Sequence, residues 1–69
     1  MVEVFKTNVI QNELAFQLRA ALESRLPSHK INFDLEDCDK ILRIEGHTIP
    51  TKMVIEFLAN QGFQCEVLN

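Results

Sequence analysis

Apolar residues recur at two different spacings along this chain of 69 residues, and each change of spacing predicts a change of secondary structure. Over positions 2–6, and again at Ile31, Phe33 and Leu35, they alternate with polar residues, which is typical of strands buried on one face. Between these two segments they recur every three or four residues, which places them on one face of a helix. The residues of this helical face are Leu14, Leu18, Ala21 and Leu22.

The second half of the chain repeats this order. A polar turn over 36–40 precedes a returning strand, in which Leu42 and Ile44 are expected to face inward. Pro50 is well suited to the first turn of a second helix. The buried face of that helix is expected to hold Met53, Val54, Phe57 and Leu58. Alternation then resumes through Phe63, Cys65 and Val67.

Residues with strong positional preferences mark the ends of both helices. Asn8, with Gln11 three residues later, forms a weak capping box, and Asn12 is the alternative N-cap of the first helix. Pro27 is expected to end that helix. Gly62 suits the left-handed residue that closes the second one.

The predicted order is strand, helix, strand, strand, helix, strand, in a single domain over residues 1–69. This order is typical of a ferredoxin-like α+β fold, in which two helices cover one face of a four-stranded antiparallel sheet. Phe16 falls roughly 160° from the centre of the apolar face of its helix and is expected to lie outside the core. The predicted core consists of Leu14, Leu18, Leu22, Phe33, Leu42, Ile44, Val54 and Leu58.

Charge and composition argue against several classes of function. The net charge of -3 is unlike the basic surface that supplies most of the affinity for nucleic acid. No run approaches the roughly 20 apolar residues of a membrane helix, and the start of the chain lacks the pattern of a secretory signal peptide. No nucleophile and base pattern or phosphate-binding glycine loop is present, so we expect neither an enzyme nor a cofactor. Two cysteines are too few for a disulfide scaffold and predict a reducing, cytoplasmic location.

Three stretches, taken together and in order, resemble one known family. They are Phe5-Lys6-Thr7-Asn8, Asp39-Lys40-Ile41-Leu42-Arg43-Ile44-Glu45-Gly46 and Gly62-Phe63-Gln64-Cys65-Glu66-Val67-Leu68. With them, nearly the whole chain resembles the heavy-metal-associated domains, which include small copper and zinc chaperones and the cytosolic domains of metal-pumping ATPases. The resemblance implies the same ferredoxin-like fold. In that family the first loop carries a Cys-x-x-Cys metal site, and the two cysteine positions are here Gln11 and Leu14.

The substitution of both cysteines changes what the first loop can do. Two thiolates bind Cu(I) or Zn(II) because they are soft donors, whereas Gln11 offers an amide and Leu14 offers no donor. No metal ion is therefore expected at this loop, and Leu14 is expected to be the first core residue of its helix. Val9 stands where metal-binding members carry a buried methionine, and it is expected to anchor the loop.

The resemblance also implies a docking surface, because members of the family pass metal through transient docking of this end of the fold. Phe63 matches the residue that lies over the metal loop in relatives, although a role as a core cap between sheet and helices is favoured. The candidate partner-docking residues are Val9, Gln11, Leu14 and Phe63.

Other potential metal ligands lie at both ends of the expected fold. Cys38 is flanked by two aspartates whose charge disfavours a thiolate, and Cys65 is expected to be a buried, inert thiol with no disulfide to Cys38. If Leu35 pairs with Leu42 across the hairpin, His29 and His47 become neighbours at the opposite end. Because no third ligand is evident, we expect two solvated histidines and not a zinc site. The acids Asp34, Glu36, Asp37 and Asp39 fit no calcium loop and are expected to be a solvated hairpin tip.

Phe16 and Ala20 lie on the outward face of the first helix and form a candidate self-association patch. The sequence thus favours a non-enzymatic protein-interaction or regulatory module linked to metal trafficking, with a protein partner and without nucleic acid, membrane or bound metal. The alternatives are a metal-binding or metal-transport protein that uses other ligands, and a homo-oligomer that pairs through an edge strand or through the Phe16 face.

Overall fold

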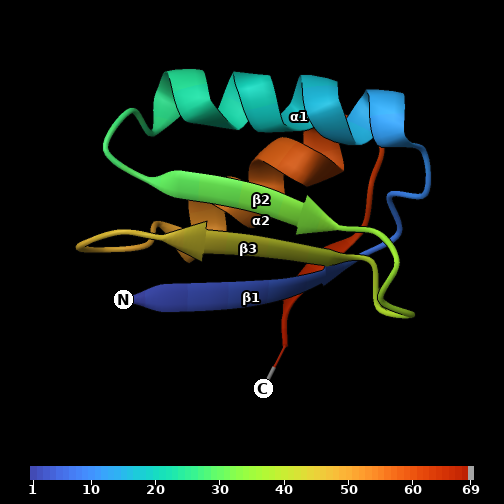
Figure 1. Ribbon diagram of the computed structural model, residues 1–69. Helices are drawn as coiled ribbons and strands as arrows, with labels where there is room; N and C mark the ends of the chain where they lie inside the picture. The colour runs from blue at the N-terminus through green and yellow to red at the C-terminus, as the bar shows by residue number, and fades with distance from the viewer. Residues whose placement is uncertain (69) are drawn as a thin grey trace.

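A computed structural model, which describes residues 1–68, has the ferredoxin-like βαββαβ order that the sequence predicts (Figure 1). Both helices lie on the same face of a four-stranded sheet, and the other face of the sheet is uncovered (Figure 1). The elements are β1 (Val2–Thr7), α1 (Asn12–Arg25), β2 (Lys30–Asp34), β3 (Ile41–Glu45), α2 (Thr51–Asn60) and β4 (Cys65–Val67).

The sheet has the order β2-β3-β1-β4, and all neighbouring strands are antiparallel. β1 and β3 are central, while β2 and β4 form the two edges. Phe5 lies opposite Leu42 on β3 and opposite Val67 on β4. Since side chains alternate between the two faces of a strand, this register brings the apolar residues of the inner face together under the helices.

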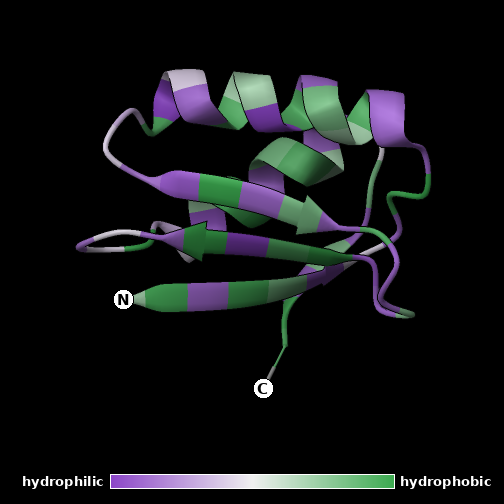
Figure 2. Cartoon of the chain, viewed as in Figure 1, coloured by the Kyte–Doolittle hydropathy of each residue, from purple (hydrophilic) through white to green (hydrophobic). Residues whose placement is uncertain are grey.

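Apolar side chains on that inner face form one core with the helices, and the alternating hydrophobic and hydrophilic bands along β2 are visible in Figure 2. In β1 the core side chain is Phe5, whereas Val2 and Val4 lie on the uncovered face. Six of the eight predicted core residues are buried, and Phe33 is half-buried against the core. The core cluster consists of Phe5, Val9, Ala15, Leu18, Leu22, Leu26, Ile31, Leu42, Ile44, Val54, Phe57 and Leu58.

The prediction that Leu14 is the first core residue of α1 is wrong. Leu14 is only half-buried, and Ala15 takes the core position, with 6% of its surface exposed. The buried residues Ala15, Leu18 and Leu22 keep the three- and four-residue spacing, so the helix turns Leu14 to the side of the buried face, toward α2. Phe16 is 68% exposed, which confirms that it lies outside the core.

Neither predicted cap of α1 is observed. Gln11 is the N-cap, and its carbonyl accepts the first helical hydrogen bond, from the Ala15 N–H at 3.0 Å, but its side chain makes no capping bond. Asn12 is already helical. The Asn8 side chain instead accepts a hydrogen bond from the backbone of Gln64, which is distant in sequence. Local side-chain capping was outcompeted by a tertiary contact.

The ends of α2 follow backbone preferences more closely. Pro50 is the N-cap itself, one position before the predicted first turn. Gly62 has φ 91°, a left-handed conformation that glycine adopts without a steric penalty. The Phe63 N–H donates to the Leu58 carbonyl and the Gly62 N–H to the Ala59 carbonyl, which together form a Schellman motif. The glycine turn that the sequence predicts is confirmed.

Neither helix described in residues 1–68 is both long and apolar enough to cross a membrane.

Candidate functional site

Three segments that are distant in sequence meet at one end of the sheet, as the alternating direction of the elements predicts. We call this surface the loop end: the β1–α1 loop (8–11), the β2–β3 turn (35–40) and the α2–β4 junction (61–64). The Thr7 N–H donates to the Asp39 carbonyl at 3.1 Å and so ties β1 to the turn. The Gln64 N–H donates to Asn8 Oδ1 at 2.8 Å and ties the junction to the loop.

Thr7 is the polar residue that joins two of these segments inside the protein. Its side chain is buried, its hydroxyl donates to the Lys40 carbonyl at 2.6 Å, and the same oxygen accepts the Val9 N–H at 3.2 Å. A hydroxyl can donate and accept at once, which a hydrocarbon side chain cannot do. Thr7 therefore fixes the loop and the turn relative to each other.

Thr7→Val is expected to lower the free energy of unfolding by about 1–3 kcal/mol, because the buried Val9 N–H would lose its hydrogen-bond partner. Thr7→Ser keeps the hydroxyl and is the matched control, with a smaller loss. Urea melts of the two variants measure the difference. Equal stability of Thr7→Val and the wild type would show that these hydrogen bonds do not hold the loop end together.

The four candidate docking residues differ in what they present to a partner. Val9 is fully buried, so it anchors the loop and offers no surface of its own. Gln11 is exposed, and Leu14 and Phe63 are half-buried. Their role in docking stays a prediction. Ile10, which the sequence reasoning missed, is 70% exposed. The available signal in the sequence was the pair of adjacent apolar residues Val9 and Ile10, of which only one is buried.

A groove of about 390 Å³ runs between the two helices and begins at the loop end. Leu14 in the first turn of α1 and Phe63 after α2 line it there. Toward the other end of α1 the Arg25 guanidinium lies over the Phe57 ring, 4.5 Å from the centroid. The remaining lining residues are Gln17, Leu18, Ala21 and Gln61. The loop end thus presents exposed Ile10 and the half-buried Leu14 and Phe63 at the start of a groove that is lined by both apolar and polar side chains.

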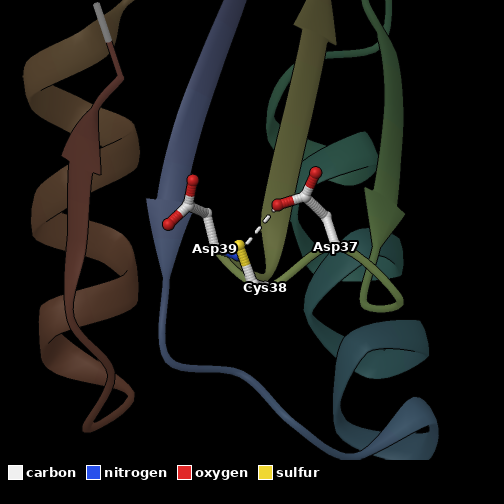
Figure 3. Close-up of side chains that lie close together, drawn as sticks. All are labelled: Asp37, Cys38 and Asp39. Atoms are coloured by element: carbon white, nitrogen blue, oxygen red, sulfur yellow. Dashed lines mark hydrogen bonds between the residues drawn. The ribbon is translucent and has the colours of Figure 1, made fainter.

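Asp37, Cys38 and Asp39 are the only three potential metal ligands that lie within 4.8 Å of one another in residues 1–68 (Figure 3). The Asp37 carboxylate already accepts the Asp39 N–H at 2.8 Å, the dashed line in Figure 3. The Asp39 carboxylate lies 3.9 Å from the Lys6 ammonium. Asp37 therefore stabilises the turn, and the positive charge of Lys6 partly offsets that of Asp39.

Neither cysteine forms a disulfide: Cys38 is exposed and Cys65 is half-buried, and both are free. Burial, with a smaller contribution from the charge of Glu66, raises the pKa of the Cys65 thiol to about 11. Because the thiolate is the form that binds metal or attacks substrates, Cys65 is protonated and inert at neutral pH.

The two histidines lie at the opposite end of the fold from the loop end, as predicted. The proposed pairing of Leu35 with Leu42 is wrong, because Phe33 occupies that position and Lys30 lies opposite Glu45. His29 consequently packs against Gly46 and not opposite His47: a methyl group at Gly46 would fall 2.8 Å from His29 Nε2.

The His29 ring is engaged by the backbone. Its Nε2 lies 2.5 Å from the Thr48 carbonyl oxygen. Because a carbonyl only accepts, Nε2 carries the hydrogen, and the buried Nδ1 has no partner among residues 1–68. His47 is exposed. The prediction of a solvated histidine therefore holds for His47 but not for His29, whose ring is half-buried and bound to the backbone.

No protein-family model matches the chain, and no curated protein matches it at a significant level. The resemblance to heavy-metal-associated domains therefore remains a prediction from the sequence.

Proposed function

We propose that this protein is a small, non-enzymatic interaction or regulatory module that docks a protein partner through its loop end. The observation that carries the proposal is the exposed Ile10, on the same end of the fold as the half-buried Leu14 and Phe63 at the mouth of the inter-helix groove. An exposed large apolar side chain at the same end of a fold as a partly apolar groove is typical of the anchors and pockets that protein interfaces use.

The hydrogen bonds of Thr7 and Asn8 are expected to lower the free-energy cost of docking. They connect the three segments of the loop end before any partner binds. Ordering loops on association costs free energy, so a surface that is already ordered loses less when it docks. A partner would meet a preformed surface.

The link to metal trafficking rests on the resemblance to heavy-metal-associated domains, in which this same end docks. With Gln11 and Leu14 at the two cysteine positions, the loop has no pair of soft donors, and we propose that docking is retained without metal capture. The two free cysteines fit our proposal of a reducing, cytoplasmic location.

Site-specific photo-crosslinking in the cells that produce the protein tests this proposal. A photoreactive residue at position 10 is expected to trap one discrete partner protein. The control position is Lys52, whose side chain is 89% exposed in the first turn of α2, away from the loop end. An added Leu14→Ser change is expected to reduce the adduct from position 10, because it removes an apolar side chain from the groove.

Adducts of equal yield from positions 10 and 52, or adducts unaffected by Leu14→Ser, would contradict docking through the loop end. An adduct with a second copy of the chain alone would identify self-association at this surface and would also contradict the proposal. Mass spectrometry of the trapped partner shows whether it is a metal transporter or another protein that handles metal.

A further inference from the structure

The edge strand β2 has a backbone that is open to a new partner. β2 pairs with β3 on one side only, and no hydrogen bond joins its backbone to any other described segment. The other edge strand, β4, has three residues, whereas β2 has five. An exposed strand edge of this length is a template for pairing with another strand.

The sequence of β2 is self-complementary when it is read in opposite directions. An antiparallel pair centred on Asn32 places Lys30 of each copy opposite Asp34 of the other, so that two pairs of opposite charge form. Both side chains are exposed in the monomer. The same register places Ile31 opposite Phe33 on the inner face, so all five residues find a partner of matching chemistry.

The surface beside this edge carries apolar side chains that are incompletely covered. A cavity of about 190 Å³ lies between α1 and the end of β2, and Phe16, Phe33 and Leu35 line it together with Ala15, Asn12 and Arg19. Phe16 is 68% exposed, while Phe33 and Leu35 are half-buried. α1 lies along β2 (Figure 1), so a second copy that pairs with β2 would bring its own α1 alongside and cover these side chains.

We propose that the protein forms a two-fold symmetric dimer in which the β2 strands of two copies pair antiparallel about Asn32. Two four-stranded sheets then form one continuous sheet of eight strands. A two-fold axis makes each contact occur twice, which is why a self-complementary strand suits a dimer. This inference goes beyond the proposed function, because it uses the β2 edge and leaves Ile10 at the loop end for a different partner.

Charge reversal at the two paired positions tests both the dimer and its register. Lys30→Asp places two carboxylates opposite each other at both ends of the strand pair, and Asp34→Lys places two ammonium groups there. Each variant alone is expected to weaken dimerisation about tenfold or more. An equimolar mixture of the two variants restores opposite charges in both pairs, so a mixed dimer is expected with nearly wild-type affinity. Both positions are exposed, so neither change removes a core contact.

Sedimentation velocity over a range of concentrations measures the dimerisation affinity of the wild type, of each variant and of the mixture. Circular dichroism shows whether each variant is folded. A wild-type protein that stays monomeric at every concentration would overturn the proposal. A dimer that neither reversal weakens, or a mixture that does not recover, would also overturn it.

Asn32→Cys in a background of Cys38→Ser and Cys65→Ser is expected to form an intermolecular disulfide, because residue 32 faces itself across the axis. Lys30→Cys in that background is expected to form much less.

Discussion

Leu22→Ala is expected to lower the free energy of unfolding by about 2–5 kcal/mol. Leu22 is fully buried and packs between α1 and the sheet, so truncation removes apolar contacts and leaves a cavity. A domain of 69 residues has a small core, and its total stability is expected to be near the lower end of the usual range of about 5–15 kcal/mol. The variant is therefore expected to be close to unfolded at 37 °C.

The control for this prediction is Phe16→Ala on the same helix. Phe16 is 68% exposed, so its truncation is expected to change monomer stability by less than about 0.5 kcal/mol. Urea melts of both variants, at a protein concentration where sedimentation shows only monomer, give the two losses. Similar large losses for Leu22→Ala and Phe16→Ala would mean that the orientation of α1 on the sheet is wrong.

Gln11→Cys combined with Leu14→Cys is expected to create a Cu(I) site. Gln11 is the N-cap of α1 and Leu14 lies three residues later, the spacing of a capping box, in which the side chain of each residue reaches the backbone N–H of the other. Two cysteines at these positions are therefore expected to reach one ion. The partial positive charge of the helix N-terminus lowers thiol pKa values and favours the thiolates that bind Cu(I). Affinity is expected to rise at least roughly 100-fold, since loss of a group that only orients a ligand already costs about 10–100-fold.

An anaerobic Cu(I) titration of the double variant, in a Cys38→Ser and Cys65→Ser background, measures this gain without the native thiols. The same background without the new cysteines is the reference and is expected to bind Cu(I) no worse than the wild type. Leu14 is half-buried, so a urea melt must first show that the double variant is folded. A folded double variant with no gain in affinity would contradict the alignment of this loop with the heavy-metal-associated family.

The predicted register of the β2–β3 hairpin shows why most of the core prediction holds although one detail is wrong. The sequence suggested that Leu35 faces Leu42, whereas Phe33 does so. Leu35 lies in the turn, where its carbonyl accepts a hydrogen bond from the Lys40 ammonium at 3.0 Å. A shift of two residues leaves every side chain on its original face, so Phe33, Leu42 and Ile44 still face inward.

The sequence by itself determined the order of the elements, the outward position of Phe16 and the glycine turn at Gly62. These features depend on hydrophobic periodicity and on the conformational preferences of single residues, which act over a few positions of the chain. These features can be predicted from the sequence because they depend only on residues that are close together in the chain.

Only the tertiary structure decided which side chains organise the loop end. Asn8 binds the backbone of Gln64, 56 residues away, and Thr7 binds that of Lys40, 33 residues away. These partners are brought together by the pairing of β1 with β3 and β4, and this contact between distant segments outweighs a local cap worth about 1 kcal/mol. The burial of Val9 beside exposed Ile10 has the same origin, because the packed core selects which of two adjacent apolar residues it accepts.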